Sequence, residues 1–332
     1  MTEDRRRSIF PSSVFRHPSK DYPTQNFNHS AQVKMHEGEI DIDAALVKRL
    51  LVEQFPHLAE KSITVVRSTG TLNAIYRLGS DLYVRLSRVA EWAESIEREW
   101  TWLPNLAPHL SLNIPKPLAR GNPTSWYPYP WAIYHWIDGT PYQDDLIDDE
   151  RQVAHELVNF ILELRSVDKL GAPRGGRSPL IELDVETRAA IVSAHGMIDT
   201  GAVSSAWTRA LQAPSWDENP VWIHGDLIKS NLLVRGGRLH AVIDFGGAGI
   251  GDPAMDVIPA WSVFNKLGRE IFRTALNVDD DTWCRARSYA LHQALLIIPY
   301  YRDTNPEFVT MAKWTVDEIL KEINNEASLS PI

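Results

Sequence analysis

The amino-acid sequence predicts an α+β protein in which strands are concentrated in the first 140 residues and helices dominate the remainder. Three short apolar runs between residues 63 and 86, separated by two turns, predict strands. Later segments, such as 153–164 and 291–298, carry apolar residues at helical spacing. Between them, the turn-rich tetrapeptide 235–238 separates two apolar runs, which is typical of a β-hairpin.

Composition narrows the possible classes of protein. The chain has 332 residues, 44% of them hydrophobic, enough for a sizeable core in one or two domains. A single cysteine, Cys284, cannot form an internal disulfide, so a reducing cytoplasm is the expected location. The net charge of −9 argues against nucleic acid as a partner, because phosphate contacts need clustered Lys and Arg. No apolar run has the length of a membrane span, so no membrane partner is expected either.

The N-terminal part begins with a polar segment and continues into a helix. Residues 1–35 contain three prolines and several serines without a sustained period, and we expect a flexible arm there. Asp41 or Asp43 can cap the helix that follows, in which apolar residues recur at helical spacing from Val47 to Phe55.

The first turn between the predicted strands is a candidate phosphate-binding loop. It is short, small and polar, and it contains Ser68, Thr69, Gly70 and Thr71. Backbone N–H groups in such a turn can approach phosphate oxygens. An ordinary hairpin turn explains the same residues equally well, since the segment lacks the pattern G-x-G-x-x-G.

A helix predicted over residues 92–103 contains one acidic residue in its apolar stripe. At about 100° per residue, Glu99 lies in line with Trp92, Ile96 and Leu103. A carboxylate among apolar side chains needs a partner, because burying an unpaired charge is costly. Prolines from Pro104 onward then predict a loop, which precedes a further strand.

Polar residues surround the predicted hairpin at fixed spacing. Asp226 and Asn231 lie on the segment that enters it, five residues apart, and Asp244 follows thirteen residues later at its exit. Phosphoryl transfer needs a carboxylate to orient the attacking hydroxyl and oxygen ligands for magnesium on the nucleotide phosphates. The spacing matches the kinase patterns H-x-D-x-x-x-x-N and D-F-G. The alternative is that all three are turn and capping residues, which are often Asp or Asn.

These motifs resemble the aminoglycoside phosphotransferase family of small-molecule kinases, within the protein-kinase-like superfamily. Gly225, where protein kinases usually carry Arg, favours this family over the protein kinases. The resemblance covers most of the chain, from about Ile40 to Asn305. The residues that carry it are His224-Gly225-Asp226-Leu227, Asn231-Leu232-Leu233, Ile243-Asp244-Phe245-Gly246 and Gly251-Asp252-Pro253-Ala254-Met255-Asp256.

The resemblance implies a two-lobed protein-kinase-like fold. We expect a β-rich, nucleotide-binding N-lobe over residues 36–136 and a mainly helical, catalytic and substrate-binding C-lobe over residues 137–332. Asp138-Gly139 matches the end of the hinge between the lobes, where backbone groups near His135 and Ile137 would hold adenine. We expect Asp252 and Asp256 to orient their turn and not to bind metal.

Arg85 departs from the family pattern. In kinases a Lys on the third strand contacts the α- and β-phosphates and pairs with a Glu of the following helix. Here the strand residue is Arg85, and we expect it to pair with Glu99 and to contact the nucleotide. The alternative is a surface Arg on an edge strand. The change is not conservative, because a guanidinium is planar and forked whereas an ammonium is a point charge.

The predicted reaction is ATP-dependent phosphorylation of a hydroxyl on a small molecule, with Asp226 orienting the hydroxyl and Asn231 and Asp244 holding Mg²⁺. The resemblance favours an aminoglycoside-like antibiotic as acceptor. A macrolide, a sugar, a choline-like amine or homoserine remains open, because loops determine specificity. The alternative from another class is a regulatory protein that binds nucleotide without catalysis. Arg85 in place of Lys favours this alternative, whereas the intact set Asp226, Asn231 and Asp244 argues against it. The sequence does not indicate an oligomeric state.

Overall fold

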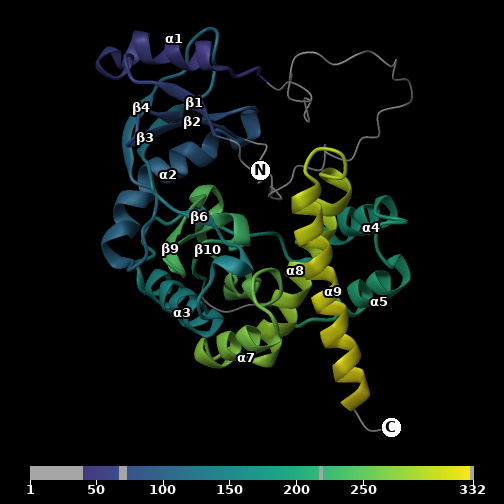
Figure 1. The fold of residues 1–332 in the computed structure, drawn as a ribbon. Coiled ribbons are helices and arrows are strands. Elements are labelled where there is room, and N and C mark those ends of the chain that lie inside the picture. The colour runs from purple at the N-terminus through teal and green to yellow at the C-terminus, as the bar shows by residue number, and fades with distance from the viewer. Residues whose placement is uncertain (1–39, 67–72, 217–219, 330–332) are drawn as a thin grey trace, which may run out of the picture.

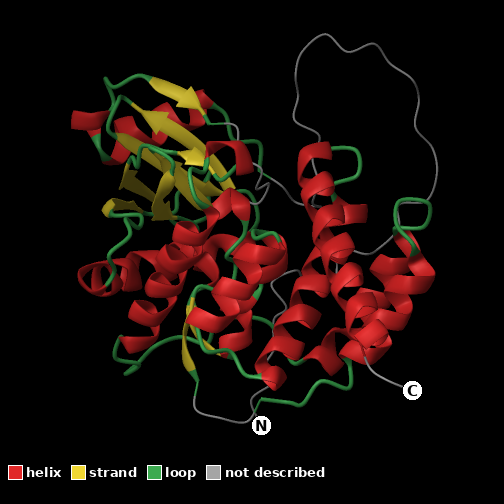
Figure 2. Cartoon of the chain, turned by 60° about the horizontal axis from the view of Figure 1, so that its bottom comes forward, coloured by secondary structure: helices red, strands yellow, loops and turns green. Residues whose placement is uncertain are grey.

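The computed structural model of the chain describes residues 40–66, 73–216 and 220–329. The predicted flexible arm, residues 1–35, and the candidate phosphate turn, residues 68–71, lie outside these ranges. The described residues form a strand-rich lobe, from α1 to β5, and a larger helical lobe, from β6 to α9 (Figure 1 and Figure 2).

One antiparallel sheet forms the centre of the strand-rich lobe, in the spatial order β1-β2-β3-β5-β4. Its strands are β1 (Ile63–Val65), β2 (Asn73–Leu78), β3 (Leu82–Ser87), β4 (Pro117–Gly121) and β5 (Trp131–His135). The first three confirm the strands predicted between residues 63 and 86.

Helices cover both faces of this sheet. Trp131 and Ile133 of β5 belong to the apolar core shared with α1 (Ala44–Gln54). Ala132 and Tyr134, which alternate with them, belong to the core that α2 (Ala93–Leu106) shares with the helical lobe. Figure 1 shows α1 above the sheet and α2 below it. Because side chains alternate along a strand, each face of the sheet packs against a different helix.

Arg85 lies on the face of the sheet that α2 covers. Its neighbours Val84 and Leu86 in β3 belong to the core on the α1 side, so the side chain between them points to the other face. Arg85 is buried there, and its contact with the nucleotide stays a prediction. The alternative prediction, a surface arginine on an edge strand, is wrong, because β3 lies between β2 and β5.

Helix α2 continues through Pro104, where the sequence predicted a loop. A proline costs a helix one backbone hydrogen bond, since it has no N–H to donate. Here the side chains on either side, Leu103 and Leu106, are buried in the apolar core. Their packing keeps the last turn helical despite the missing bond.

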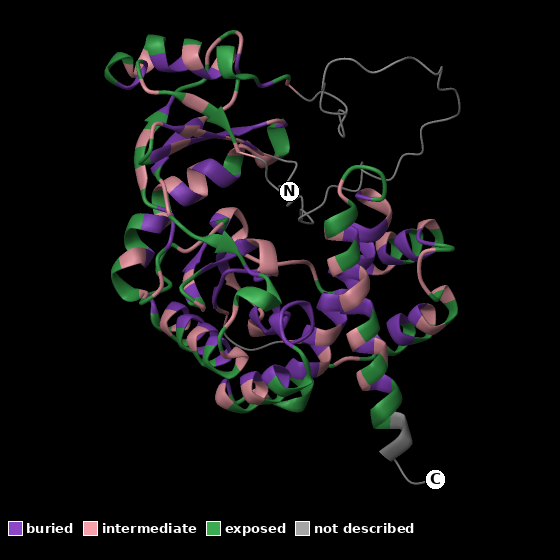
Figure 3. Ribbon diagram, in the orientation of Figure 1, coloured by how far each residue is buried: buried purple, intermediate pink, exposed green. Residues whose placement is uncertain are grey.

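The helical lobe is built around α8 (Asp280–Tyr300). Most of its 21 residues are buried, and it packs against α4, α5, α6 and α9 (Figure 3). The other helices of this lobe are α3 (Glu150–Ser166), α4 (Asp184–Ser193), α5 (Thr200–Ala210), α6 (Pro259–Ser262), α7 (Lys266–Ala275) and α9 (Pro306–Leu329).

The predicted hairpin is present in the helical lobe as β8 (Leu232–Arg235) and β9 (Arg238–Val242). Its two turn residues, Gly236 and Gly237, have φ of 60° and 73°. Two successive positive φ values define the tight turn that suits the twist of a hairpin, and glycine adopts them without steric cost. The remaining strands of this lobe are β6 (Thr140–Pro141), β7 (Val221–Ile223) and β10 (Gly249–Gly251).

Among the residues that the structure describes, no helix is both long enough and apolar enough to pass through a membrane.

Asp43 caps α1, and its removal should destabilise the protein. The carboxylate accepts a hydrogen bond from the backbone N–H of Leu46 at 2.7 Å. We expect Asp43→Ala to lower the free energy of unfolding by about 1 kcal/mol, because an N–H at the start of the helix loses its partner. Urea denaturation measures this value. The exposed residue Glu53 of the same helix provides the control, and equal losses for Asp43→Ala and Glu53→Ala would contradict the role of the cap.

Candidate active site

A buried carboxylate fixes the backbone at the start of the candidate catalytic loop. Asp256 accepts hydrogen bonds from the backbone N–H groups of His224, at 2.9 Å, and Gly225, at 2.8 Å. Gly225 has φ of 80°, a conformation that a residue with a Cβ rarely adopts. The loop therefore needs both this glycine and the carboxylate beneath it. The expectation that Asp256 orients the turn agrees with these contacts.

His224 connects the two ends of the segment that contains the hairpin. Its Nδ1 accepts a hydrogen bond from the Asp226 N–H at 3.3 Å, so Nε2 carries the proton and donates to the Ile243 carbonyl at 3.1 Å. The ring packs edge-on against Phe245 with centroids 4.6 Å apart. Burial lowers the pKa of His224, which keeps the imidazole neutral. This histidine holds Asp226 and Asp244 near each other.

Asp226 and Asn231 contact each other directly. The Asn231 side-chain nitrogen donates to the Asp226 backbone carbonyl and to its Oδ2, both at 2.9 Å. Gln293 of α8 donates from Nε2 to Oδ1 of the same carboxylate at 2.6 Å. The Asp226 side chain still exposes 31% of its surface, so another molecule can reach it.

Asp244 lies at the exit of the hairpin in a left-handed backbone conformation, with φ of 67° and ψ of 66°. Its Oδ1 accepts a hydrogen bond from Arg85 Nη2 at 2.8 Å, and its side chain exposes 47% of its surface. Partial burial acts to raise the pKa of Asp244, but the charge and hydrogen bond of Arg85 outweigh this effect, so the pKa lies below its usual value. The carboxylate is therefore ionised at neutral pH.

Arg85 and Glu99 form a buried ion pair at the junction of the two lobes. Arg85 Nη1 donates to Glu99 Oε1 at 2.6 Å, and both side chains are almost fully buried. Glu99 also accepts hydrogen bonds from the Tyr134 hydroxyl, at 2.8 Å, and from the Phe245 backbone N–H, at 2.9 Å. The partner that Glu99 was expected to need is thus present, and the network extends to the segment that carries Asp244.

Two further candidate nucleotide-binding residues, His135 and Ile137, lie at and beyond the end of β5. Residues 68–71 lie outside the described part of the chain. His135 ends β5, and its backbone N–H already donates to the Lys116 carbonyl at 2.9 Å. Ile137 follows two residues later and is half-buried. Binding of adenine by the backbone near His135 and Ile137 stays a prediction.

Two further residues of the segment have structural partners. Lys229, three residues after Asp226, donates to both oxygens of Asp144 at 2.7 and 2.9 Å and lies over the Trp314 ring at 4.6 Å. Asp252 caps the Ala254 N–H at 2.9 Å and pairs with Arg285 at 2.8 Å, as expected for a residue that orients its turn.

Arg177 and Gln293 lie beside Asp226, and neither residue was predicted from the sequence. Arg177 Nη2 is 4.0 Å from Asp226 Oδ1. Arg177 belongs to a loop rich in Gly, Pro and Arg, which gives no periodic signal. Gln293 lies about 200° around α8 from Leu291, opposite the apolar stripe predicted for residues 291–298, so helical periodicity did not mark it.

Asn231 and Asp244 each keep one side-chain oxygen available for a magnesium ion. Among the described residues, no group of three or more His, Cys, Asp and Glu side chains is arranged to hold a metal ion. Asn231 uses its amide nitrogen toward Asp226, which leaves its amide oxygen, and Asp244 uses Oδ1 toward Arg85, which leaves Oδ2. Two oxygen donors fit Mg²⁺, which usually keeps several waters and binds substrate phosphates.

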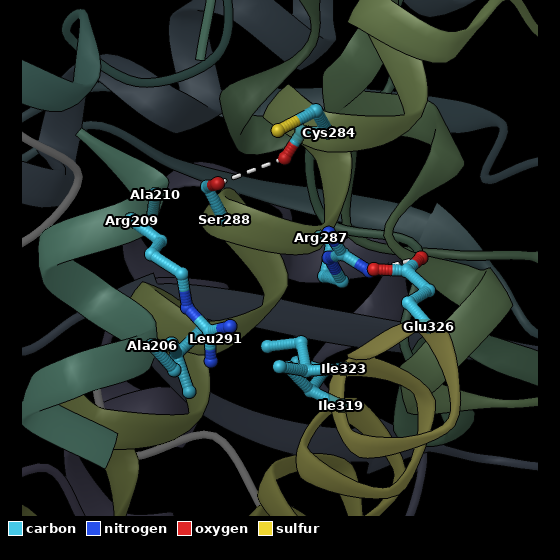
Figure 4. A pocket seen from close by; sticks show the side chains of 10 residues that line it. All are labelled: Ala206, Arg209, Ala210, Cys284, Arg287, Ser288, Leu291, Ile319, Ile323 and Glu326. Carbon is cyan, nitrogen blue, oxygen red and sulfur yellow. Dashed lines mark hydrogen bonds and ion pairs between the residues drawn. The ribbon is translucent and has the colours of Figure 1, made fainter. Parts of the chain in front are cut away.

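A cavity of about 120 Å³ lies elsewhere in the helical lobe, between α5, α8 and α9 (Figure 4). Cys284 lines it, and Arg287 and Glu326 form a hydrogen bond of 2.7 Å beside it. Gln293 follows Cys284 by nine residues, which at about 100° per residue places the two on opposite faces of α8. The cavity is therefore separate from the residues around Asp226.

The chain is similar to known proteins in sequence and in fold. Residues 64–290 match the family described as the phosphotransferase enzyme family. The uncharacterized protein YcbJ of Bacillus subtilis (strain 168) is 24% identical over 177 residues, which cover 49% of this chain and 53% of YcbJ. The chain thus spans about half the length of this relative.

Solved structures share the fold. The GDP and kanamycin complex of APH(2″)-IIia has a TM-score of 0.67 at 19% identity, covering 84% of this chain and 98% of that one. A macrolide 2′-phosphotransferase from Brachybacterium faecium, solved as the apoenzyme, has a TM-score of 0.55 at 21% identity, covering 81% and 98%. These similarities confirm the predicted two-lobed, protein-kinase-like fold.

The two hydrogen bonds to Asp256 should contribute measurably to stability. Asp256→Asn replaces one acceptor oxygen by an N–H group that faces a backbone N–H. We expect the free energy of unfolding to fall by roughly 1–3 kcal/mol, because a buried donor is left without a partner. Urea denaturation measures the loss against Asp281→Asn, an exposed aspartate of α8. A loss no larger than in that control would show that Asp256 does not hold the loop.

Proposed function

The chain belongs to the phosphotransferase enzyme family, and on that premise we propose that it transfers the γ-phosphoryl group of ATP to a hydroxyl of a small molecule. The observation that carries the proposal is the contact of Asp226 with Asn231, at 2.9 Å, while His224 connects Asp226 to the segment that carries Asp244. Burial raises the pKa of Asp226, and the charge of Asp244 adds to this effect. A carboxylate beside two oxygen donors is what phosphoryl transfer requires.

Asp226 is the proposed catalytic residue. Its partly exposed carboxylate orients the acceptor hydroxyl and takes its proton as the oxygen bonds to the γ-phosphorus. The bond from the γ-phosphorus to the bridging oxygen breaks, and ADP leaves with the electron pair. The contribution of the protein is mostly positioning and electrostatic stabilisation, because the reaction passes through no covalent enzyme intermediate.

Asn231 and Asp244 are the proposed magnesium ligands, through the two oxygens that their protein contacts leave available. When bound with the nucleotide, Mg²⁺ supplies positive charge that offsets the charge on the phosphate oxygens. The lowered pKa of Asp244 keeps this side chain in the ionised form that a metal ligand needs.

Arg85 is proposed to contact the nucleotide phosphates from the strand-rich lobe, and Glu99 to hold Arg85 in place. The proposed boundary of this nucleotide-binding lobe lies near residue 136. Their ion pair supports this role, since the corresponding Lys and Glu of kinases are paired. Arg85 differs in that two of its nitrogens already bond carboxylates. The other proposed nucleotide contacts are residues 68–71 and the backbone at His135 and Ile137.

An aminoglycoside-like antibiotic is the first candidate for the acceptor. The kanamycin complex supports it, with a TM-score of 0.67 over 84% of this chain. A macrolide is the second candidate, because the macrolide phosphotransferase also matches over 81% of the chain. A panel of aminoglycosides, macrolides, sugars and amino alcohols with radiolabelled ATP tests these classes. Magnesium-dependent ATP binding without transfer to any acceptor would favour the regulatory alternative.

Asp226→Asn should abolish most of the transfer. The amide can neither take a proton nor carry the charge, so we expect kcat to fall by about 10²- to 10⁴-fold. Affinity for Mg·ATP, measured by calorimetry, should stay within about threefold, since the residue orients the acceptor. Asp281→Asn, at the surface of α8, is the matched control. A fully active Asp226→Asn would refute the assignment.

Arg85→Ala should weaken nucleotide binding. Loss of the guanidinium removes the cation expected near the phosphates and leaves Glu99 buried without its partner. We expect the Kd for ATP to rise by about tenfold or more, which corresponds to at least ~1.4 kcal/mol. Arg120→Ala, which breaks the more exposed ion pair with Glu97, is the matched control in the same lobe. Near-normal affinity and turnover in Arg85→Ala would remove Arg85 from the site.

A further inference from the structure

Arg177 is a buried cation that the reaction described so far does not use. Its side chain exposes 1% of its surface. Nη1 donates to the Gly225 carbonyl at 3.3 Å, while Nε and Nη2 are buried without a hydrogen-bond partner. Leaving buried donors unpaired is costly, and a buried charge needs compensation nearby.

Asp226 is a carboxylate close enough to compensate this charge. Arg177 Nη2 lies 4.0 Å from Asp226 Oδ1, within the range of an ion pair and beyond that of a hydrogen bond. Burial lowers the pKa of Arg177, and Asp226 leads the groups that oppose this shift. Catalytic hydrogen bonds are often long in a free enzyme and shorten in the complex with substrates.

Gln293 approaches the same oxygen from a different element. Its Nε2 donates to Asp226 Oδ1 at 2.6 Å from α8, and the residue is itself buried. Asn231 contacts the other oxygen, Oδ2, from the hairpin side. Three separate elements thus restrain one carboxylate, which nevertheless keeps 31% of its side-chain surface exposed.

The loop that carries Asp226 does not itself provide this positive charge. Lys229, three residues further on, is bonded to Asp144 and lies over the Trp314 ring. Ile228, between them, is apolar and buried. Arg177, on the loop between α3 and α4, is a cation within ion-pair distance of Asp226.

We propose that Arg177 and Gln293 are positioning residues, which hold Asp226 Oδ1 from the buried side so that the exposed part of the carboxylate faces the acceptor hydroxyl. This inference rests on the proposed role of Asp226. A carboxylate attached through two rotatable bonds can turn its oxygens away from the reacting atoms. A displacement of 1 Å can cost about 10²-fold in rate, so restraints on both oxygens have catalytic value.

Kinetics separate positioning from a purely structural role. For Arg177→Met and Gln293→Met we expect kcat to fall by about 10- to 100-fold with the KM for Mg·ATP within about threefold, because orientation is lost while nucleotide contacts remain. Arg269→Met is the matched control, since Arg269 is a buried arginine paired with Glu318 in another part of the lobe. We expect the control to lower the Tm but to keep kcat within about twofold. If the loss of kcat in Arg177→Met and Gln293→Met is no greater than in this control, the proposal is wrong.

A thermal double-mutant cycle tests the contact without any measurement of activity. Arg177→Met, Asp226→Asn and the double variant are compared by their Tm in the full chain. We expect Arg177→Met to lower the Tm less in the Asp226→Asn background than in the wild type, because the paired charge is already gone. Additive shifts would overturn the proposal, even if the enzyme transfers phosphate. Conversely, coupled shifts in a protein without transferase activity would reject the proposed function alone.

Discussion

The buried guanidinium of Arg85 joins the two lobes at the point where they meet. One of its terminal nitrogens bonds Glu99 of α2 and the other bonds Asp244, which follows the hairpin of the helical lobe. Glu99 in turn accepts the Phe245 N–H, so the same pair of charges also fixes the backbone beside Asp244. Removing either partner of a buried pair leaves an uncompensated charge, so this guanidinium helps to set the relative placement of the lobes and keeps Asp244 ionised.

The helical lobe provides a second set of buried polar contacts, around Asp226. Asp256 fixes the backbone before it, His224 connects it to the far end of the hairpin, and Gln293 contacts its side chain from α8. The two sets serve different purposes. The pair Arg85–Glu99 belongs to the strand-rich lobe and holds Asp244 and the Phe245 backbone. The contacts around Asp226 lie within the helical lobe and hold the carboxylate of Asp226. Each functional side chain is thus restrained by neighbours that are themselves buried.

Local patterns predicted most of the fold and part of the site. The spacing of Asp226, Asn231 and Asp244 could be predicted because a hairpin with a two-glycine turn separates them, and helical periodicity singled out Glu99. Arg177 and Gln293 could not be predicted in this way, because they reach Asp226 from loops and helices 49 and 67 residues away along the chain, through tertiary packing. The loop predicted from Pro104 was wrong for a related reason, since burial of Leu103 and Leu106 outweighs the tendency of proline to end a helix.

The left-handed backbone at Asp244 limits what evolution or design can place there. Aspartate, asparagine and glycine tolerate φ of 67°, whereas other residues lose roughly 1–2 kcal/mol in this conformation. Glycine has no ligand atom, and asparagine lacks the charge that Arg85 requires. Glutamate, usually regarded as the mildest replacement for an acid, would fail here on conformational grounds even though its chemistry is right. A single residue therefore supplies both the sharp bend of the chain and the negative charge, and aspartate meets both requirements.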